Sequence, residues 1–129
     1  MLAIDTNLVI RYLTGDHPKQ STRARKLIDA GDIYVGITVM LEAEWVLRSV
    51  YEYQPGDVCR ALRAFAGLPG ITIEDEALVA TALDHVERGM DFADALHLGK
   101  ARHCEALVTF DRKFIKAAKA ADVEMVREA

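Results

Sequence analysis

The stretch Leu2-Ala3-Ile4-Asp5-Thr6-Asn7 decides the fold of this 129-residue chain. Its apolar residues form a run that is too short and too uniform for an exposed, alternating strand, so they predict a buried strand of a parallel sheet. The polar residues that follow predict a strand-to-helix junction, with a first helix over about residues 8–13.

The same alternation continues along the chain. Further strands are predicted at about residues 33–37, 71–73, 106–110 and 123–126, and further helices at about residues 18–31, 38–50, 55–67, 75–88, 92–103 and 112–121. Strands that alternate with helices imply βαβ units with right-handed crossovers. We therefore predict an α/β fold in one domain, residues 1–129, with three α/β/α layers around a mainly parallel sheet of four or five strands.

Composition narrows the class of protein. Hydrophobic residues make up 51% of the chain and charged residues 28%, and the formal net charge is −4. Because the net charge is negative, the surface as a whole does not attract nucleic acid, and contact with nucleic acid requires a local basic patch or metal ions.

Cys59 and Cys104 match neither a CxxC motif nor a disulfide framework, and no apolar run is long enough to span a bilayer. We expect a cytoplasmic protein with free thiols and no membrane segment.

Four separated carboxylates are the candidate functional groups. Asp5 and Asp111 follow predicted strands, where open parallel sheets collect their ligands, and Glu42 and Asp94 interrupt the apolar faces of predicted helices. An ionised carboxylate near an apolar interior needs a cation or hydrogen bonds, or it stays protonated. A bound divalent metal is one way to satisfy all four.

Each aspartate also has a simpler structural role. Asp5 is a candidate cap for the helix that follows it, although Thr6 and Asn7 are equally suitable caps. Asp91 and Asp94 imitate a capping box, in which Asp91 is the cap. Asp111 is a candidate cap for the helix beginning at residue 112.

The two glutamates of the third predicted helix differ in their neighbours. Glu44 precedes Arg48 by four residues, which predicts an exposed ion pair. Glu42 shares an apolar stripe with Val39 and Val46 and has no basic residue one turn later. We therefore predict that Glu42 is the functional acid of the two.

Oxygen-only ligands indicate a particular metal. Carboxylates suit Mg²⁺ or Mn²⁺, which also bind phosphate oxygens. Basic residues near such a site, Arg112 and Lys113 with Arg48, are predicted to contact substrate phosphates.

Four segments in this order resemble a PIN-domain nuclease, and specifically the VapC-type toxin of a toxin–antitoxin pair. They are Ile4–Asn7, Leu41–Leu47, Asp91–Leu96 and Thr109–Phe114. Carried over by position, the acidic quartet of the family falls on Asp5, Glu42, Asp94 and Asp111. The polar helper positions fall on Asn7 and Thr109, and Asp91 matches an acid that often accompanies the quartet.

The resemblance implies an activity and partners. It implies an Mg²⁺- or Mn²⁺-dependent endoribonuclease that acts on RNA, a homodimer, and inhibition by a VapB-type antitoxin whose C-terminal segment occupies the toxin groove. A larger hetero-oligomer with the antitoxin is also consistent with the family. Contact with promoter DNA is expected only through the antitoxin.

Three other classes of protein share some of these sequence features. A phosphoacceptor receiver domain has a similar fold, but the first strand here supplies only one acid and no middle strand carries a convincing phosphoacceptor. A haloacid-type phosphatase requires a second aspartate at position 7, which is Asn7. A PIN-like scaffold that binds a partner without catalysis stays open as the main alternative.

Overall fold

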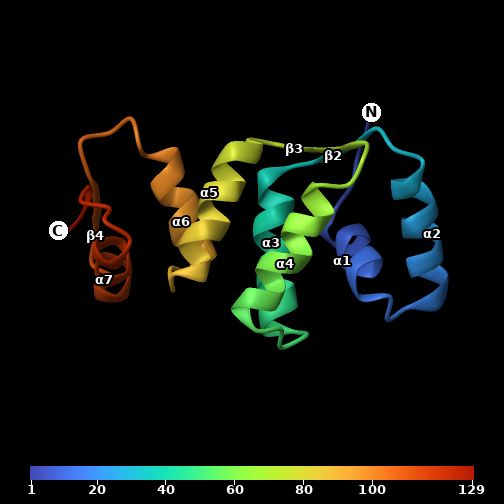
Figure 1. Cartoon of the computed structure of the whole chain (residues 1–129), viewed down its shortest axis with the longest axis horizontal. Coiled ribbons are helices and arrows are strands. Elements are labelled where there is room, and N and C mark those ends of the chain that lie inside the picture. The colour runs from blue at the N-terminus through green and yellow to red at the C-terminus, as the bar shows by residue number, and fades with distance from the viewer. The chain divides into compact units, whose positions relative to one another are not determined.

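The computed structural model describes all 129 residues, which form seven helices and five strands (Figure 1). The helices are α1 (Thr6–Thr14), α2 (Pro18–Asp29), α3 (Ile37–Ser49), α4 (Pro55–Ala66), α5 (Glu76–Glu87), α6 (Phe92–Lys100) and α7 (Arg112–Ala120). The strands are β1 (Leu2–Ala3), β2 (Ile33–Val35), β3 (Ile71–Ile73), β4 (Leu107–Thr109) and β5 (Val126–Glu128). Every strand pairing is parallel, which confirms the predicted α/β class. The chain divides into two compact units, Met1–Glu76 and Ala77–Ala129, which are described in turn.

The first unit contains a three-stranded parallel sheet in the order β1-β2-β3. The central strand β2 pairs with both neighbours, so that Ile33 lies opposite Leu2 on one side and Ile71 on the other. Ile33 and Val35 are fully buried. Parallel neighbours cannot be joined by a tight turn, and the chain accordingly passes through α1 and α2 between β1 and β2, and through α3 and α4 between β2 and β3.

The helices of the first unit pack through apolar faces. Helix α1 contacts both α2 and α3, and α3 contacts α4. The ring of Tyr12 meets that of Phe65 edge to face, with 5.8 Å between the centroids, a favourable geometry for aromatic pairs. The side chains that fill this core include Val9, Ile10, Ala24, Ile28, Met40, Ala43, Leu47, Val58, Cys59 and Leu62.

The second unit contains the two-stranded parallel sheet of β4 and β5, with Leu107 opposite Val126. Helix α7 connects these strands and packs against both. Helices α5 and α6 approach closely at Gly99 of α6. A Cβ at this position would lie only 3.0 Å from Cγ of Leu78 on α5, so the close approach requires a glycine. No helix of the chain combines the length and apolar character required to cross a bilayer.

The first strand is less buried than the sequence predicts. Leu2 is 56% exposed and Ala3 is also exposed, whereas Ile4 is only 6% exposed. The prediction of a buried strand is therefore wrong for the two residues of β1. It is correct for Ile4, the residue between β1 and the strand-to-helix junction.

Two further boundaries differ from the prediction. Helix α3 begins at Ile37 rather than at about residue 38, and the Ile37 amide donates to Oε1 of Glu74 at 2.9 Å. A side chain distant in sequence thus satisfies one of the first amides of the helix. The last strand begins at Val126, not Val123, since the Val123 amide still donates to the Ala118 carbonyl and extends the end of α7.

Gly70 is predicted to be sensitive to substitution because two backbone segments meet there. Its φ is +79°, and an added Cβ would lie 2.7 Å from Cα of Gly31. Gly15 offers a matched control, since its φ is +65° but an added Cβ would meet nothing within 4 Å. Gly15→Ala should cost about 1 kcal/mol from the left-handed backbone alone. Gly70→Ala should cost about 1–3 kcal/mol more through the backbone overlap. Urea unfolding of both variants measures this, and equal losses would contradict the predicted overlap.

Candidate active site

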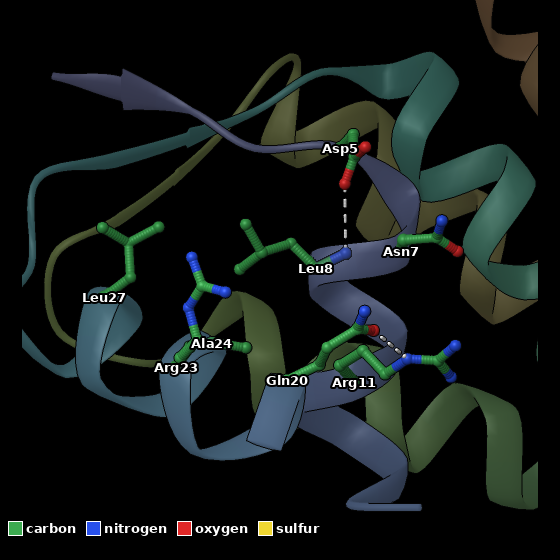
Figure 2. Close-up of a pocket in the computed structure, with 8 residues that line it drawn as sticks. All are labelled: Asp5, Asn7, Leu8, Arg11, Gln20, Arg23, Ala24 and Leu27. Atoms are coloured by element: carbon green, nitrogen blue, oxygen red, sulfur yellow. Dashed lines mark hydrogen bonds between the residues drawn. The ribbon is translucent and has the colours of Figure 1, made fainter. Parts of the chain in front are cut away.

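Asp5 lies at the junction of β1 and α1 and caps the helix. Its Oδ1 accepts a hydrogen bond from the Leu8 amide at 3.1 Å (Figure 2). The residue is exposed, and its second carboxylate oxygen has no protein donor. The structural role of Asp5 is therefore real, yet it leaves half of the carboxylate available for a ligand. Asn7 is exposed one half-turn further along α1 and lines the same pocket as Asp5.

Asp111 repeats this arrangement at the junction of β4 and α7. Its Oδ1 accepts hydrogen bonds from the amides of Lys113 and Phe114, at 2.9 and 3.2 Å. The Asp111 amide in turn donates to Oγ1 of Thr109 at 3.0 Å. Thr109 thus helps to hold the backbone of the cap, and Oδ2 of Asp111 is left without a protein donor.

Asp94 lies in the first turn of α6, which Asp91 caps as predicted. Oδ1 of Asp91 accepts a hydrogen bond from the Asp94 amide at 3.1 Å. Asp94 itself is half-buried, and burial raises the pKa of its carboxyl above the ordinary value of 3.8. The negative charges of Asp91 and Asp111 raise that pKa further, whereas His97 acts in the opposite direction. The structure therefore brings Asp94 and Asp111 within electrostatic reach of one another.

The two glutamates of α3 have the reverse of their predicted exposure. Glu44 is only 3% exposed, and its carboxylate accepts hydrogen bonds from Nε and Nη2 of Arg48, at 2.9 and 3.3 Å. The predicted pair exists, but it is buried at its acidic end. Glu42 is exposed and makes no ion pair, and the large side chain of Trp45, three residues later, is 53% exposed. The apolar face of α3 is thus formed by Met40, Ala43 and Leu47.

The candidate acids of each unit offer oxygen, the donor that hard divalent cations take. Asp5 and Glu42 in the first unit and Asp94 and Asp111 in the second form no ion pair, and two like charges oppose the ionisation of Asp94. A cation would relieve that repulsion, and oxygen ligands are those that Mg²⁺ and Mn²⁺ prefer. No three acidic, histidine or cysteine side chains gather closely enough in the chain to hold a metal ion by themselves.

The three basic residues that are predicted to contact phosphates differ in the ion pairs that they form within the protein. Arg48 binds Glu44, and Nε of Arg112 lies 3.7 Å from a carboxylate oxygen of Glu128 in a strongly exposed pair. Lys113 is exposed and has no ion pair. Of the three, Lys113 is the one whose charge is uncommitted in the structure.

A pocket between α1 and α2 contains residues that the sequence analysis missed. It has a volume of about 440 Å³ and is lined by Asp5, Asn7, Leu8, Arg11, Gln20, Arg23, Ala24 and Leu27 (Figure 2). A signal for it exists in the sequence, because Asn7 and Arg11 are one turn apart on one helix and Gln20 and Arg23 are one turn apart on the next. Such polar pairs beside apolar positions indicate a shared face.

One comparison with known proteins identifies a family. The family model of the PIN domain matches residues 2–120. This range includes all four candidate carboxylates and the basic residues at the start of α7. No curated protein and no solved structure gives a significant match to the chain.

The buried Glu44 predicts an asymmetric loss of stability. Arg48→Met should cost about 1–3 kcal/mol, because it leaves a buried carboxylate without its donor. Glu44→Gln should cost less, since the guanidinium of Arg48 is 39% exposed and is able to turn to water. The double variant Glu44→Gln with Arg48→Met should be more stable in chemical denaturation than Arg48→Met alone, because it no longer buries an unpaired carboxylate. A double variant that loses the sum of both effects would contradict the buried-charge explanation.

The raised pKa of Asp94 predicts that Asp94→Asn stabilises the metal-free protein at neutral pH. Between pH 3.8 and the raised pKa, the folded protein holds more protons than the unfolded chain, so stability falls as pH rises through that window. The neutral amide removes this decline. Thermal unfolding in chelator should give a higher Tm for the variant at pH 7 and a smaller difference near pH 3. An equal or lower Tm at pH 7 would show that the repulsion has no effect on folding.

Proposed function

The chain belongs to the PIN-domain family, and we propose that it is an Mg²⁺- or Mn²⁺-dependent endoribonuclease. The PIN domain is a nuclease-type fold, so the family supports hydrolysis of a nucleic acid. The proposal adds the metal, the RNA substrate and the residues that act. It does not depend on a basic protein surface, which a net charge of −4 does not provide.

The observation that carries the proposal is the state of the aspartates. Asp5 and Asp111 each use one oxygen to cap a helix and keep the other oxygen for a ligand. Asp94 is held half-buried beside two further acids, in an environment that opposes its ionisation. A protein that needed only helix caps would gain nothing from this repulsion, whereas a cation site requires concentrated negative charge.

Each acid has a role in the proposed site. Asp5 and Asp94 are the principal ligands, Glu42 is a ligand or positions the attacking water, and Asp111 is a second ligand or an anchor in the outer shell. When bound, the ion supplies positive charge for the developing phosphate oxyanion and lowers the pKa of water. Asn7 and Thr109 support these acids, and Asp91 fixes the start of the helix that carries Asp94.

The reaction is the in-line hydrolysis of a phosphodiester. The oxygen of water forms a bond to phosphorus, and the bond to the leaving oxygen of the RNA breaks, without a covalent bond to the protein. Lys113 and Arg112, at the start of α7, hold substrate phosphates. Arg48 is a further phosphate contact, through the part of its guanidinium that its ion pair with Glu44 leaves exposed. Rate enhancement then comes from positioning and charge stabilisation.

The biological setting that we propose is a toxin–antitoxin pair of the VapBC type. The four matching segments lie in the order of a VapC toxin and within the range of the family match. In this setting the protein is a homodimer, a VapB-type antitoxin inhibits it in a larger complex, and the antitoxin makes the contact with promoter DNA.

The acids predict the outcome of single substitutions in an RNA cleavage assay. Asp5→Asn and Asp94→Asn should each abolish Mg²⁺-dependent cleavage while the protein stays folded, because each removes a ligand charge and keeps the shape of the side chain. Glu42→Gln should also reduce the rate strongly, whereas Glu44→Gln should retain most of it. Gel assays on a mixed RNA pool, with circular dichroism as the folding check, measure both quantities.

Asp29→Asn is the matched control, since Asp29 is an exposed acid at the end of α2, outside the proposed site. Cleavage that persists at the wild-type rate in Asp5→Asn and Asp94→Asn would refute the proposed site. Growth arrest on expression, with relief by Asp5→Asn, tests the toxin role. Folded wild-type protein that binds neither Mg²⁺ nor Mn²⁺ in calorimetry would favour the non-catalytic scaffold.

A further inference from the structure

The pocket between α1 and α2 begins at Asp5 and extends away from it along both helices. Its volume of about 440 Å³ lies within the range of small-molecule sites. Asp5 and Leu8 line it from the start of α1, and Leu27 lines it from α2 (Figure 2). A molecule seated here would therefore lie directly beside one of the proposed metal ligands.

The wall of the pocket combines apolar and hydrogen-bonding groups. Leu8 and Leu27 are half-buried and Ala24 is 4% exposed, so together they provide an apolar surface. Asn7 and Gln20 add side-chain amides, which both donate and accept. A flat, partly apolar ligand with polar edges matches this wall better than a simple ion does.

One arginine of the pocket is held rigidly. Nε of Arg11 donates to Oε1 of Gln20 at 2.8 Å, and its Nη1 donates to Asp16 and to the hydroxyl of Tyr51, both at 3.2 Å. The Tyr51 hydroxyl also donates to Oδ2 of Asp16 at 2.6 Å. This network fixes Gln20 with its amide nitrogen available, and Asp16 offsets much of the Arg11 charge.

The other arginine is uncommitted. Arg23 is exposed and makes no hydrogen bond or ion pair, and Figure 2 shows it reaching from α2 toward the side chain of Leu8. Arg25, two residues along the same helix, is also exposed but does not line the pocket. Arg23 is therefore the group that would neutralise an anion in this pocket, in a protein whose net charge is negative.

We propose that this pocket binds one nucleotide of the RNA substrate, next to the phosphate that is cut, and so contributes to the choice of cleavage site. The proposal rests on the proposed nuclease function for its biological meaning. The base or ribose lies against Leu8, Ala24 and Leu27, the amides of Asn7 and Gln20 face its polar edges, and Arg23 binds its phosphate. Single-stranded RNA is the form in which such edges are open to a protein.

The cleavage test compares Arg23→Gln with Arg25→Gln, which removes the same charge from the same helix outside the pocket. Arg23→Gln should raise KM about 10- to 100-fold, the scale of one hydrogen bond to a charged group, and change kcat little. It should also alter the distribution of cuts in a mixed RNA pool, and Arg25→Gln should leave both unchanged. If wild-type protein cleaves RNA and the two variants behave alike, the pocket proposal is wrong and the nuclease proposal stands.

The binding test does not depend on catalysis. Amide NMR spectra of the wild-type protein in chelator are recorded with each nucleoside 5′-monophosphate and, separately, with inorganic phosphate. Nucleotides should shift signals of residues 5–8 and 20–27 in the wild type and in Arg25→Gln, and not in Arg23→Gln. Equal shifts with inorganic phosphate alone would overturn the nucleotide proposal, because the pocket would then recognise only an anion. No shift with any nucleotide would also overturn it, even if RNA is cleaved. Specific nucleotide shifts without RNA cleavage would support the pocket and refute the nuclease function.

Discussion

The carboxylate that caps a helix at the end of a strand is the interaction on which the candidate site depends. A helix begins with amides that have no partner within it, and a short acidic side chain in an extended backbone satisfies them. Asp5 and Asp111 do this in the two units of the chain, through Oδ1 in each case. The cap fixes the position of the carboxylate, so that the remaining oxygen is held in place rather than free to rotate. One side chain is thus able to cap a helix with one oxygen and to present the other oxygen to a ligand.

The electrostatics of α6 illustrate the cost of such a site. Asp91 satisfies the Asp94 amide, yet its charge opposes the ionisation of the Asp94 side chain, and Asp111 adds to the same effect. A different cap, such as serine, would satisfy the amide without adding a negative charge. The arrangement therefore lowers the stability of the folded protein when Asp94 is ionised, and a loss of stability of this kind is common at functional sites.

The sequence identified the elements well where local chemistry determines them. Pro18 and Pro55 begin helices, and Gly15 ends one with a positive φ, because these residues restrict or permit the backbone by themselves. Alternation of strands and helices was sufficient for the parallel pairing. The start of α3 was not predictable in this way, because its first amide is bound by Glu74, which lies 37 residues away. Capping by a distant side chain leaves no local pattern.

The exposure of the α3 glutamates was wrong for a related reason. Helical spacing from Val39 and Val46 placed Glu42 on an apolar stripe, but the buried stripe of α3 runs through Met40, Ala43 and Leu47 and takes Glu44 with it. Spacing alone did not distinguish two overlapping stripes on a helix rich in apolar residues. The ion pair with Arg48 was nevertheless correct, because an i, i+4 pair depends only on the helix that contains it. Contacts within an element were thus more predictable than the side on which the element packs.

The pocket beside Asp5 shows how an acidic protein is able to attract an anion locally. The net charge of −4 acts over the whole surface, but salt at physiological strength screens exposed charges beyond about 8 Å. A single uncommitted arginine in a partly apolar pocket then supplies positive charge that a bound anion is able to use, while Asp16 keeps the neighbouring Arg11 in a structural role. Arg11 and Arg23 line the same pocket and differ in their partners. That difference, rather than the number of basic residues, separates the group that shapes the pocket from the group that is available to a ligand.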